Sequence, residues 1–189
     1  MDPVSVLYER IIKNVIKKQK LPEHIVLALA ESDLLADMNF KKLSSFVSWC
    51  NETGLKTVTV YINIIEVDEQ MSKNICGKLS QEIPPWLFSM THNINVITRG
   101  DKEVKEYGGD GMQVDISLGF GGKYELTRAL KEIMKYVENG SLAPEDIDEE
   151  TIESRLLFKS EPDLVIRAGG KRLTDFLIWQ SVYSELYFT

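Results

Sequence analysis

Residues 57–65 read Thr-Val-Thr-Val-Tyr-Ile-Asn-Ile-Ile, and this stretch decides the fold class of the chain. Its β-branched and aromatic residues are typical of a β-strand. A second apolar run, Ile-Val-Leu-Ala-Leu at 25–29, contains no alternating polar residue, as expected of a strand that is covered on both faces. Between the two runs, apolar residues recur at helical spacing from 40 to 50, and Gly54 follows at a position typical of a helix C-cap.

Strand and helix patterns continue to alternate toward the C-terminus. We predict strands at 94–97, 112–118, 164–167 and 186–188, helices at 68–90, 123–138 and 174–184, and short helical turns near 144 and 148. Pro84-Pro85 is expected to interrupt the first of these helices, and the glycines between 100 and 111 indicate a loop. This alternation predicts one α/β domain over residues 1–189, with a mostly parallel central sheet flanked by helices.

The composition and net charge of the chain exclude some classes of protein function. With 189 residues, 43% hydrophobic and 27% charged, the chain has the profile of a folded globular protein. A net charge of −7 weighs against a nucleic-acid partner, which needs a basic face. The two cysteines lack metal or disulfide spacing, and neither a signal peptide nor an apolar run of about 20 residues is present, so we expect a cytoplasmic protein. Residues 1–20 predict an amphipathic, basic helix, which leaves open a peripheral contact with anionic lipid.

The most informative loop follows the predicted strand at 164–167. It reads Arg167-Ala-Gly-Gly-Lys-Arg172 and leads into a helix predicted to begin at Thr174. Guanidinium groups, glycines that allow close backbone approach and free helix N–H groups suit phosphate oxygens. An arginine-rich turn paired with neighbouring acids explains the same residues, and both interpretations stay open. His24 and His92 have no partner at catalytic or metal-ligand spacing and are expected to be ordinary surface or edge residues.

Three segments of the chain resemble the cis-prenyltransferases, the undecaprenyl diphosphate synthase family. Residues 162–189, PDLVIRAGGKRLTDFLIWQSVYSELYFT, are similar to the family's C-terminal pattern PDLLIRTGGExRLSNFLLWQxAYSELYFT, with one residue deleted before Lys171. Residues 118–129 resemble its LNYGGRxEIxxA block, and 22–29 resemble its first strand, PxHVAIIM. The resemblance implies a sheet surrounded by helices, a dimer, and condensation of isopentenyl diphosphate with an allylic diphosphate in the presence of Mg²⁺.

The same resemblance assigns roles to four residues. In the family, the arginines and the serine of the C-terminal block hold isopentenyl diphosphate, which implies this role for Arg167, Arg172 and Thr174, with threonine in place of serine. The family's metal-associated glutamate corresponds to Glu185, which the resemblance marks as a metal ligand acting together with a partner chain.

Two departures from the family pattern affect the other half of the site. The family's first strand ends in DGNGR, whose aspartate organises Mg²⁺ and the allylic diphosphate; here Ala30 replaces the aspartate and Leu34 replaces the arginine. An alanine methyl cannot ligate a hard cation, and leucine cannot neutralise a diphosphate. The block YAFSxENWxR is also lost, with Ile64 in place of serine and Asp68 in place of tryptophan.

These departures lead to a ranked set of hypotheses. The first is a non-catalytic or accessory subunit of a heteromeric cis-prenyltransferase, similar to the Nogo-B receptor type of partner. A second chain with intact DGNGR would then supply the active site and bind most of the Mg²⁺. The alternatives are an active homodimer with a metal site rebuilt from Glu31 or Asp33, and an isoprenoid-diphosphate-binding sensor.

Overall fold

The computed structural model describes residues 21–30, 34, 40–64, 68–90, 94–99, 104–109, 111–119, 121–168 and 175–189. The helix predicted at 1–20 lies outside these residues. So do five residues singled out from the sequence: Glu31, Asp33, His92, Arg172 and Thr174.

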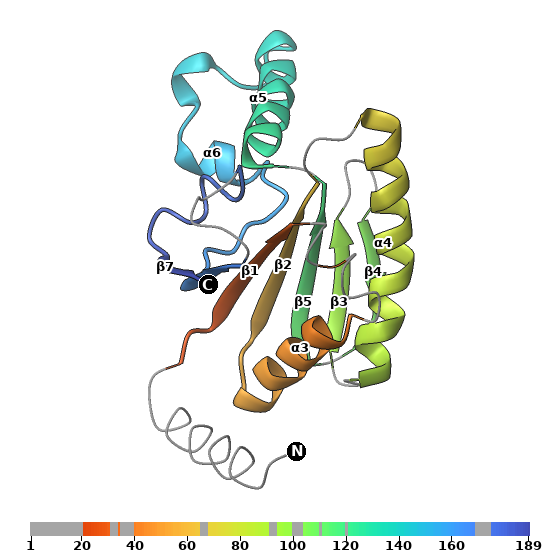
Figure 1. Cartoon of the computed structure of the whole chain (residues 1–189). Helices are drawn as coiled ribbons and strands as arrows, with labels where there is room; N and C mark the ends of the chain where they lie inside the picture. Colours follow the sequence, from red (N-terminus) through yellow and green to blue (C-terminus); the bar gives the residue numbers. More distant parts are fainter. Residues whose placement is uncertain are drawn as a thin grey trace, which may run out of the picture.

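The described part of the chain forms one seven-stranded sheet (Figure 1). Its strands run in the order β4-β3-β5-β2-β1-β6-β7 across the sheet. β3 and β4 are antiparallel, and every other neighbouring pair is parallel, which confirms the predicted mostly parallel sheet. The strands are β1 (His24–Ala30), β2 (Thr57–Asn63), β3 (Ile94–Arg99), β4 (Val104–Tyr107), β5 (Met112–Leu118), β6 (Leu164–Arg167) and β7 (Glu185–Phe188).

Two helices cover one face of this sheet, α3 (Lys41–Thr53) and α4 (Glu69–Met90) (Figure 1). Alternate residues of β1, β2 and β5 point toward them and form a continuous apolar core with residues such as Val47 of α3 and Ile83 of α4. α3 ends at Gly54, whose φ of 87° provides the predicted left-handed cap.

The remaining helices stand beyond the carboxyl ends of the strands. They are α5 (Gly122–Glu138), a 3₁₀ turn (Pro144–Asp146) and α6 (Glu149–Glu153) (Figure 1). Asp148 caps α6, because its carboxylate accepts a hydrogen bond from Thr151 N at 2.8 Å. The second face of the sheet carries a smaller apolar cluster that joins β1, β2 and β6 to Phe158, Phe176 and Leu177.

Three predicted elements need correction. α4 runs through Pro84-Pro85 without the expected interruption, because Ile83 and Leu87 on either side of the pair are buried in the core. The segment expected to be a loop at 100–111 contains strand β4. The described part of the helix predicted at 174–184 is a series of turns, with a positive φ of 28° at Leu177.

His24 is also not the surface or edge residue that we expect from the sequence. It opens β1, between β2 and β6, and is only 6% exposed. Its Nε2 lies 2.8 Å from Thr59 Oγ1, and its Nδ1 lies 3.3 Å from the carbonyl oxygen of Glu161. Burial lowers the pKa of His24 below its usual value, against the opposing influence of the carboxylates of Asp115 and Asp163.

Candidate functional site

The candidate site lies at the carboxyl edge of the sheet, where parallel α/β sheets bind ligands. Ala30 ends β1 and pairs with Asn63, which ends β2. Two residues earlier in β1, Ala28 pairs with Arg167 of β6. Because side chains alternate along a strand, Ala28, Ala30 and Arg167 share one face. The structure therefore brings the predicted phosphate-binding arginine close to the position of the lost aspartate.

Arg167 is largely enclosed at this edge. Its guanidinium donates a hydrogen bond from Nη1 to the carbonyl oxygen of Ala28 at 3.1 Å, and the residue is 5% exposed. Its Nε is buried and has no hydrogen-bond partner in the described part of the chain. A buried guanidinium with an unused donor can bind an anion. Its assignment to isopentenyl diphosphate stays a prediction, as do those of Arg172 and Thr174.

Two of the residues that depart from the family pattern, Leu34 and Asp68, have structural roles in this fold. Leu34 is 5% exposed and belongs to the apolar core on the α3 and α4 side of the sheet. Asp68 accepts a hydrogen bond from Met71 N at 2.8 Å and so caps the first turn of α4. Both residues therefore stabilise the fold at positions where the family carries an arginine and a tryptophan.

The described residues at this edge do not fit a magnesium site. Mg²⁺ takes oxygen ligands, and here the neighbouring ends of β1 and β2 offer a methyl group from Ala30 and one amide from Asn63. Among the residues that the structure describes, no three His, Cys, Asp or Glu side chains are grouped so that they could hold a metal ion.

Glu185 lies apart from Ala30 and Arg167. It begins β7, where it pairs with Leu164, whereas Arg167 pairs with Phe188 three residues further along the same strands. At about 3.3 Å per residue, this places Glu185 roughly 10 Å toward the amino end of the sheet. Its side chain is exposed. A metal role for Glu185 therefore stays a prediction that requires a second chain.

Two residues that the sequence analysis did not single out, Tyr61 and Asp175, are joined by a hydrogen bond near this site. Tyr61 of β2 is 1% exposed and donates a hydrogen bond from its hydroxyl to the carbonyl oxygen of Asp175 at 2.6 Å. Burial raises the pKa of Tyr61, and the carboxylates of Asp175 and Glu125 act in the same direction. The sequence offered one signal for Asp175. This residue directly follows Thr174, and the family pattern has an asparagine at the position of Asp175.

Comparison with known proteins identifies the fold and the family. The family model described as "Putative undecaprenyl diphosphate synthase" matches residues 68–189, well over half of the chain. The chain belongs to the undecaprenyl diphosphate synthase family. This finding confirms the family resemblance.

Several relatives of this chain are named as synthases. The chain is 30% identical to the geranylgeranyl-diphosphate-specific tritrans,polycis-undecaprenyl-diphosphate synthase of Pyrococcus furiosus, covering 98% of this chain and 83% of the relative. It is 28% identical to the (2Z,6E)-farnesyl diphosphate synthase of Mycobacterium tuberculosis, covering 100% and 86%. The alignment with the Methanocaldococcus jannaschii synthase spans 219 positions against 189 residues here, so at least 30 positions of that relative have no counterpart.

Solved structures agree on the fold. Lavandulyl diphosphate synthase from Lavandula x intermedia, in complex with dimethylallyl diphosphate, superimposes with a TM-score of 0.70 at 23% identity, covering 89% of this chain and 86% of the other. A probable undecaprenyl diphosphate synthase from Campylobacter jejuni gives a TM-score of 0.66 at 19% identity, with 90% and 87% covered. Within the described residues, no helix is long and apolar enough to cross a membrane.

Proposed function

We propose that this chain is the accessory subunit of a heteromeric cis-prenyltransferase that makes long-chain polyprenyl diphosphate from isopentenyl diphosphate and an allylic diphosphate. A catalytic chain with intact DGNGR would bind Mg²⁺ and ionise the allylic donor. The observation that carries the proposal is Ala30, a methyl group at the carboxyl end of β1 where the family's aspartate belongs. Without a metal or cationic clamp, the negative charge that develops on the leaving diphosphate has no stabilisation.

The packing around the apolar core supports this proposal. Leu34 contributes to that core instead of extending a cation toward a diphosphate. The core side chains of α4 that face the sheet, Leu79, Ile83 and Leu87, are each at most 1% exposed. At the arginine position of the family pattern this chain therefore has a structural core residue.

A partner chain is supported by a set of exposed apolar residues that we together call the partner face. It consists of exposed apolar residues on α5 and on the segment 178–188: Tyr124, Leu130, Met134, Ile178, Val182, Tyr183, Leu186, Tyr187 and Phe188. Of the large apolar side chains that are exposed in the described part of the chain, only Met71 lies elsewhere. β7 also forms an edge of the sheet, so its outer backbone groups are available for pairing. Concentrations of exposed apolar residues of this kind mark protein interfaces.

The buried Arg167 supports a contribution to substrate binding. Its retention goes beyond what a pure scaffold requires, because an apolar residue would pack at a 5% exposed position without leaving a donor unused. We therefore assign this subunit the family's isopentenyl diphosphate contacts, Arg167, Arg172 and Thr174, and we assign Glu185 to a metal site completed by the partner. The complex would act in the cytoplasm, with peripheral contact with lipid.

The decisive experiment measures incorporation of labelled isopentenyl diphosphate with Mg²⁺ and an allylic diphosphate. Three samples are compared: this chain alone, an intact family member from the same cell alone, and the two together. We expect no incorporation by this chain alone and greater incorporation by the mixture than by the partner alone. A matched control replaces the DGNGR aspartate of the partner by alanine, which should abolish activity of the mixture.

Other outcomes favour the alternatives. Robust activity of this chain alone would overturn the proposal and favour a homodimer with a metal site rebuilt from Glu31 or Asp33. Inactivity of the mixture together with measurable diphosphate binding would favour a sensor.

Restoring the aspartate provides a separate prediction. Ala30→Asp should leave this chain inactive by itself, because the arginine position is still occupied by the buried Leu34 and the block around Ile64 is still missing. The measurement is the same incorporation assay, with circular dichroism to confirm that the variant is folded. Activity of the Ala30→Asp chain by itself would contradict the view that the whole donor pocket has been lost.

A further inference from the structure

The segment 175–184 carries part of the partner face, yet few hydrogen bonds within its own backbone stabilise its conformation. The segment forms turns, and the backbone hydrogen bonds described within it run from Ser181 N to the carbonyl oxygen of Leu177 at 3.0 Å and from Ser184 N to that of Ser181 at 3.2 Å. Leu177 has a φ of 28°, a conformation that non-glycine residues adopt at a cost. A segment with this backbone keeps one conformation only if contacts with the rest of the protein determine it.

The first such contact is made by Asp175 at the beginning of α5. Its Oδ1 accepts a hydrogen bond from Lys123 N at 2.8 Å, and its carbonyl oxygen accepts bonds from Gly122 N at 3.2 Å and from the Tyr61 hydroxyl. The carboxylate therefore neutralises the positive end of α5 from a distant part of the chain.

Two glycines make this close approach feasible. A Cβ atom at Gly121 would lie 2.3 Å from Asp175 Oδ2, and one at Gly122 would lie 2.9 Å from Ile178 Cγ1. No side chain can occupy these positions without displacing the segment. The glycine pair is thus explained by packing against 175–178.

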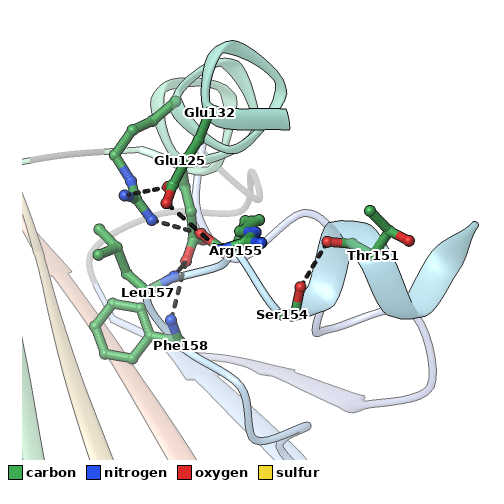
Figure 2. A network of polar contacts seen from close by, with 8 residues as sticks. Glu125, Glu132, Thr151, Ser154, Arg155, Leu157 and Phe158 are labelled. Carbon is green, nitrogen blue, oxygen red and sulfur yellow. Dashed lines mark hydrogen bonds and ion pairs between the residues drawn. The ribbon is translucent and has the colours of Figure 1, made fainter. Parts of the chain in front are cut away.

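The second contact is a buried network one turn further along α5. Glu125, 2% exposed, accepts hydrogen bonds at Oε1 from Leu157 N at 2.7 Å and Phe158 N at 3.0 Å, which are among the dashed lines in Figure 2. Its Oε2 accepts a bond from Gln180 Nε2 at 3.2 Å, and the same Nε2 donates to the carbonyl oxygen of Phe158 at 2.8 Å. Glu125 therefore ties α5, the 157–158 loop and the segment together.

We propose that Asp175, Glu125 and Gln180 form a clamp that positions the segment 175–188 for binding to the partner chain. The clamp holds the inner side of the segment, while Val182 and Tyr183 point outward and are 68% and 87% exposed. A surface that is ordered before binding loses less conformational entropy when the partner docks. The three residues act through the segment and need not touch the partner, so they are positioning residues. This inference rests on the proposed function.

The test compares Asp175→Ala and Gln180→Ala with the wild-type chain in two measurements. One is amide hydrogen exchange of residues 176–188 in the free chain, and the other is the dissociation constant for the intact family member that carries DGNGR. We expect each variant to exchange faster in this segment and to bind the partner more weakly, in each case by about tenfold or more. Amides of β2 and β5 should stay protected, which verifies that the variants are folded.

Two matched variants separate positioning from general stability. Asp175→Asn keeps an oxygen acceptor for Lys123 N and loses only the charge, so its exchange and affinity should lie much closer to the wild type than those of Asp175→Ala. Glu132→Ala alters the same helix, at a side chain that is 35% exposed and bonded to Arg128, and should change neither measurement.

Each contrary result has its own meaning. Unchanged exchange at 176–188 in Asp175→Ala and Gln180→Ala would overturn the clamp itself. Faster exchange with unchanged affinity would overturn its role in partner binding. A wild-type chain that binds no family member would overturn the proposed function, and the role in partner binding with it, while the exchange measurement would still decide whether the clamp orders the segment.

Discussion

On the second face of the sheet, burial affects the protonation of a side chain as strongly as hydrogen bonding does. His24 shows this most clearly, because its ring is enclosed between β2 and the 161–163 loop and its pKa is lowered mainly by desolvation. The carboxylates of Asp115 and Asp163 favour the protonated ring but do not overcome the loss of solvent. The folded state therefore prefers the neutral imidazole.

The first prediction at this scale concerns pH. The unfolded chain binds a proton at His24 near the ordinary pKa of 6.5, and the folded chain does so only at lower pH. The contribution of His24 to the free energy of unfolding is therefore fully present above about pH 6.5 and is lost as the pH falls from there toward the folded pKa. Urea unfolding at pH 7.5 and pH 5.0 should show a smaller pH dependence for His24→Gln than for the wild type. An identical pH dependence in the two proteins would contradict this assignment.

The second residue-scale prediction concerns Gly119, at the end of β5. Its φ is +72°, and a Cβ there would lie 2.5 Å from Cys76 Sγ. Gly140 has nearly the same φ, +74°, but open space around it, which makes it a matched control. We expect Gly140→Ala to lower the free energy of unfolding by about 1 kcal/mol from backbone strain, and Gly119→Ala by roughly 2–4 kcal/mol because of the added clash. Equal losses in urea unfolding would mean that the Cys76 side chain moves away at no cost.

At the scale of elements, α5 depends on one buried acid far more than on its surface ion pairs. Glu125→Ala leaves the N–H groups of Leu157 and Phe158 without their acceptor and removes one of the two acceptors of Gln180 Nε2, so it should cost about 3 kcal/mol or more. Glu132→Ala removes ion pairs with Arg128 and Arg155 whose side chains are 31–35% exposed, and should cost less than about 1 kcal/mol. The thermal midpoints of the two variants measure the difference, and comparable losses would contradict the importance of burial.

The strands of the fold other than β4 could be predicted from the sequence because their patterns are local. The apolar runs of β1 and β2, the β5 strand and the glycine cap of α3 each depend on residues adjacent in the chain. The turns at 178–183 could not be predicted, because apolar residues at 176, 177 and 182 imitate helical spacing. Their conformation depends on Asp175 and Gln180, whose partners are 52 and 22 residues away.

The candidate site likewise contains features that the sequence predicted and features that it did not. The sequence predicted the arginine at the end of β6 and the missing aspartate at Ala30, and the structure places both at one edge. It gave no indication that Arg167 would be buried against Ala28, because that contact depends on the pairing of β1 with β6. Likewise, Tyr61 looks like an ordinary strand residue until its hydroxyl meets Asp175.

At the scale of the whole molecule, the partner face should determine how the chain behaves in solution. Val182 and Tyr183 are highly exposed, so replacing both by serine should leave the free energy of unfolding within about 0.5 kcal/mol of the wild type. The same double variant should weaken association with the partner at least about tenfold, because exposed aromatic and apolar residues at an interface contribute most of its affinity. Analytical ultracentrifugation of the mixture measures the loss.

Met71→Ser is the control for this prediction. Met71 is 52% exposed but lies on α4, away from the partner face. Its replacement should therefore leave association unchanged. A loss of association equal to that of the Val182 and Tyr183 variant would place the contact on a different surface.

The central position of β1 has a kinetic consequence. β1 pairs with β2, which is close in the chain, and with β6, where the partners Ala28 and Arg167 are 139 residues apart. Closing so long a loop is entropically slow, so refolding should begin among neighbouring strands and wait for β6 to dock. In stopped-flow experiments, the sheet edge that carries Arg167 and the clamp should therefore form in the slowest phase, and a newly made chain would become competent to assemble only after that step.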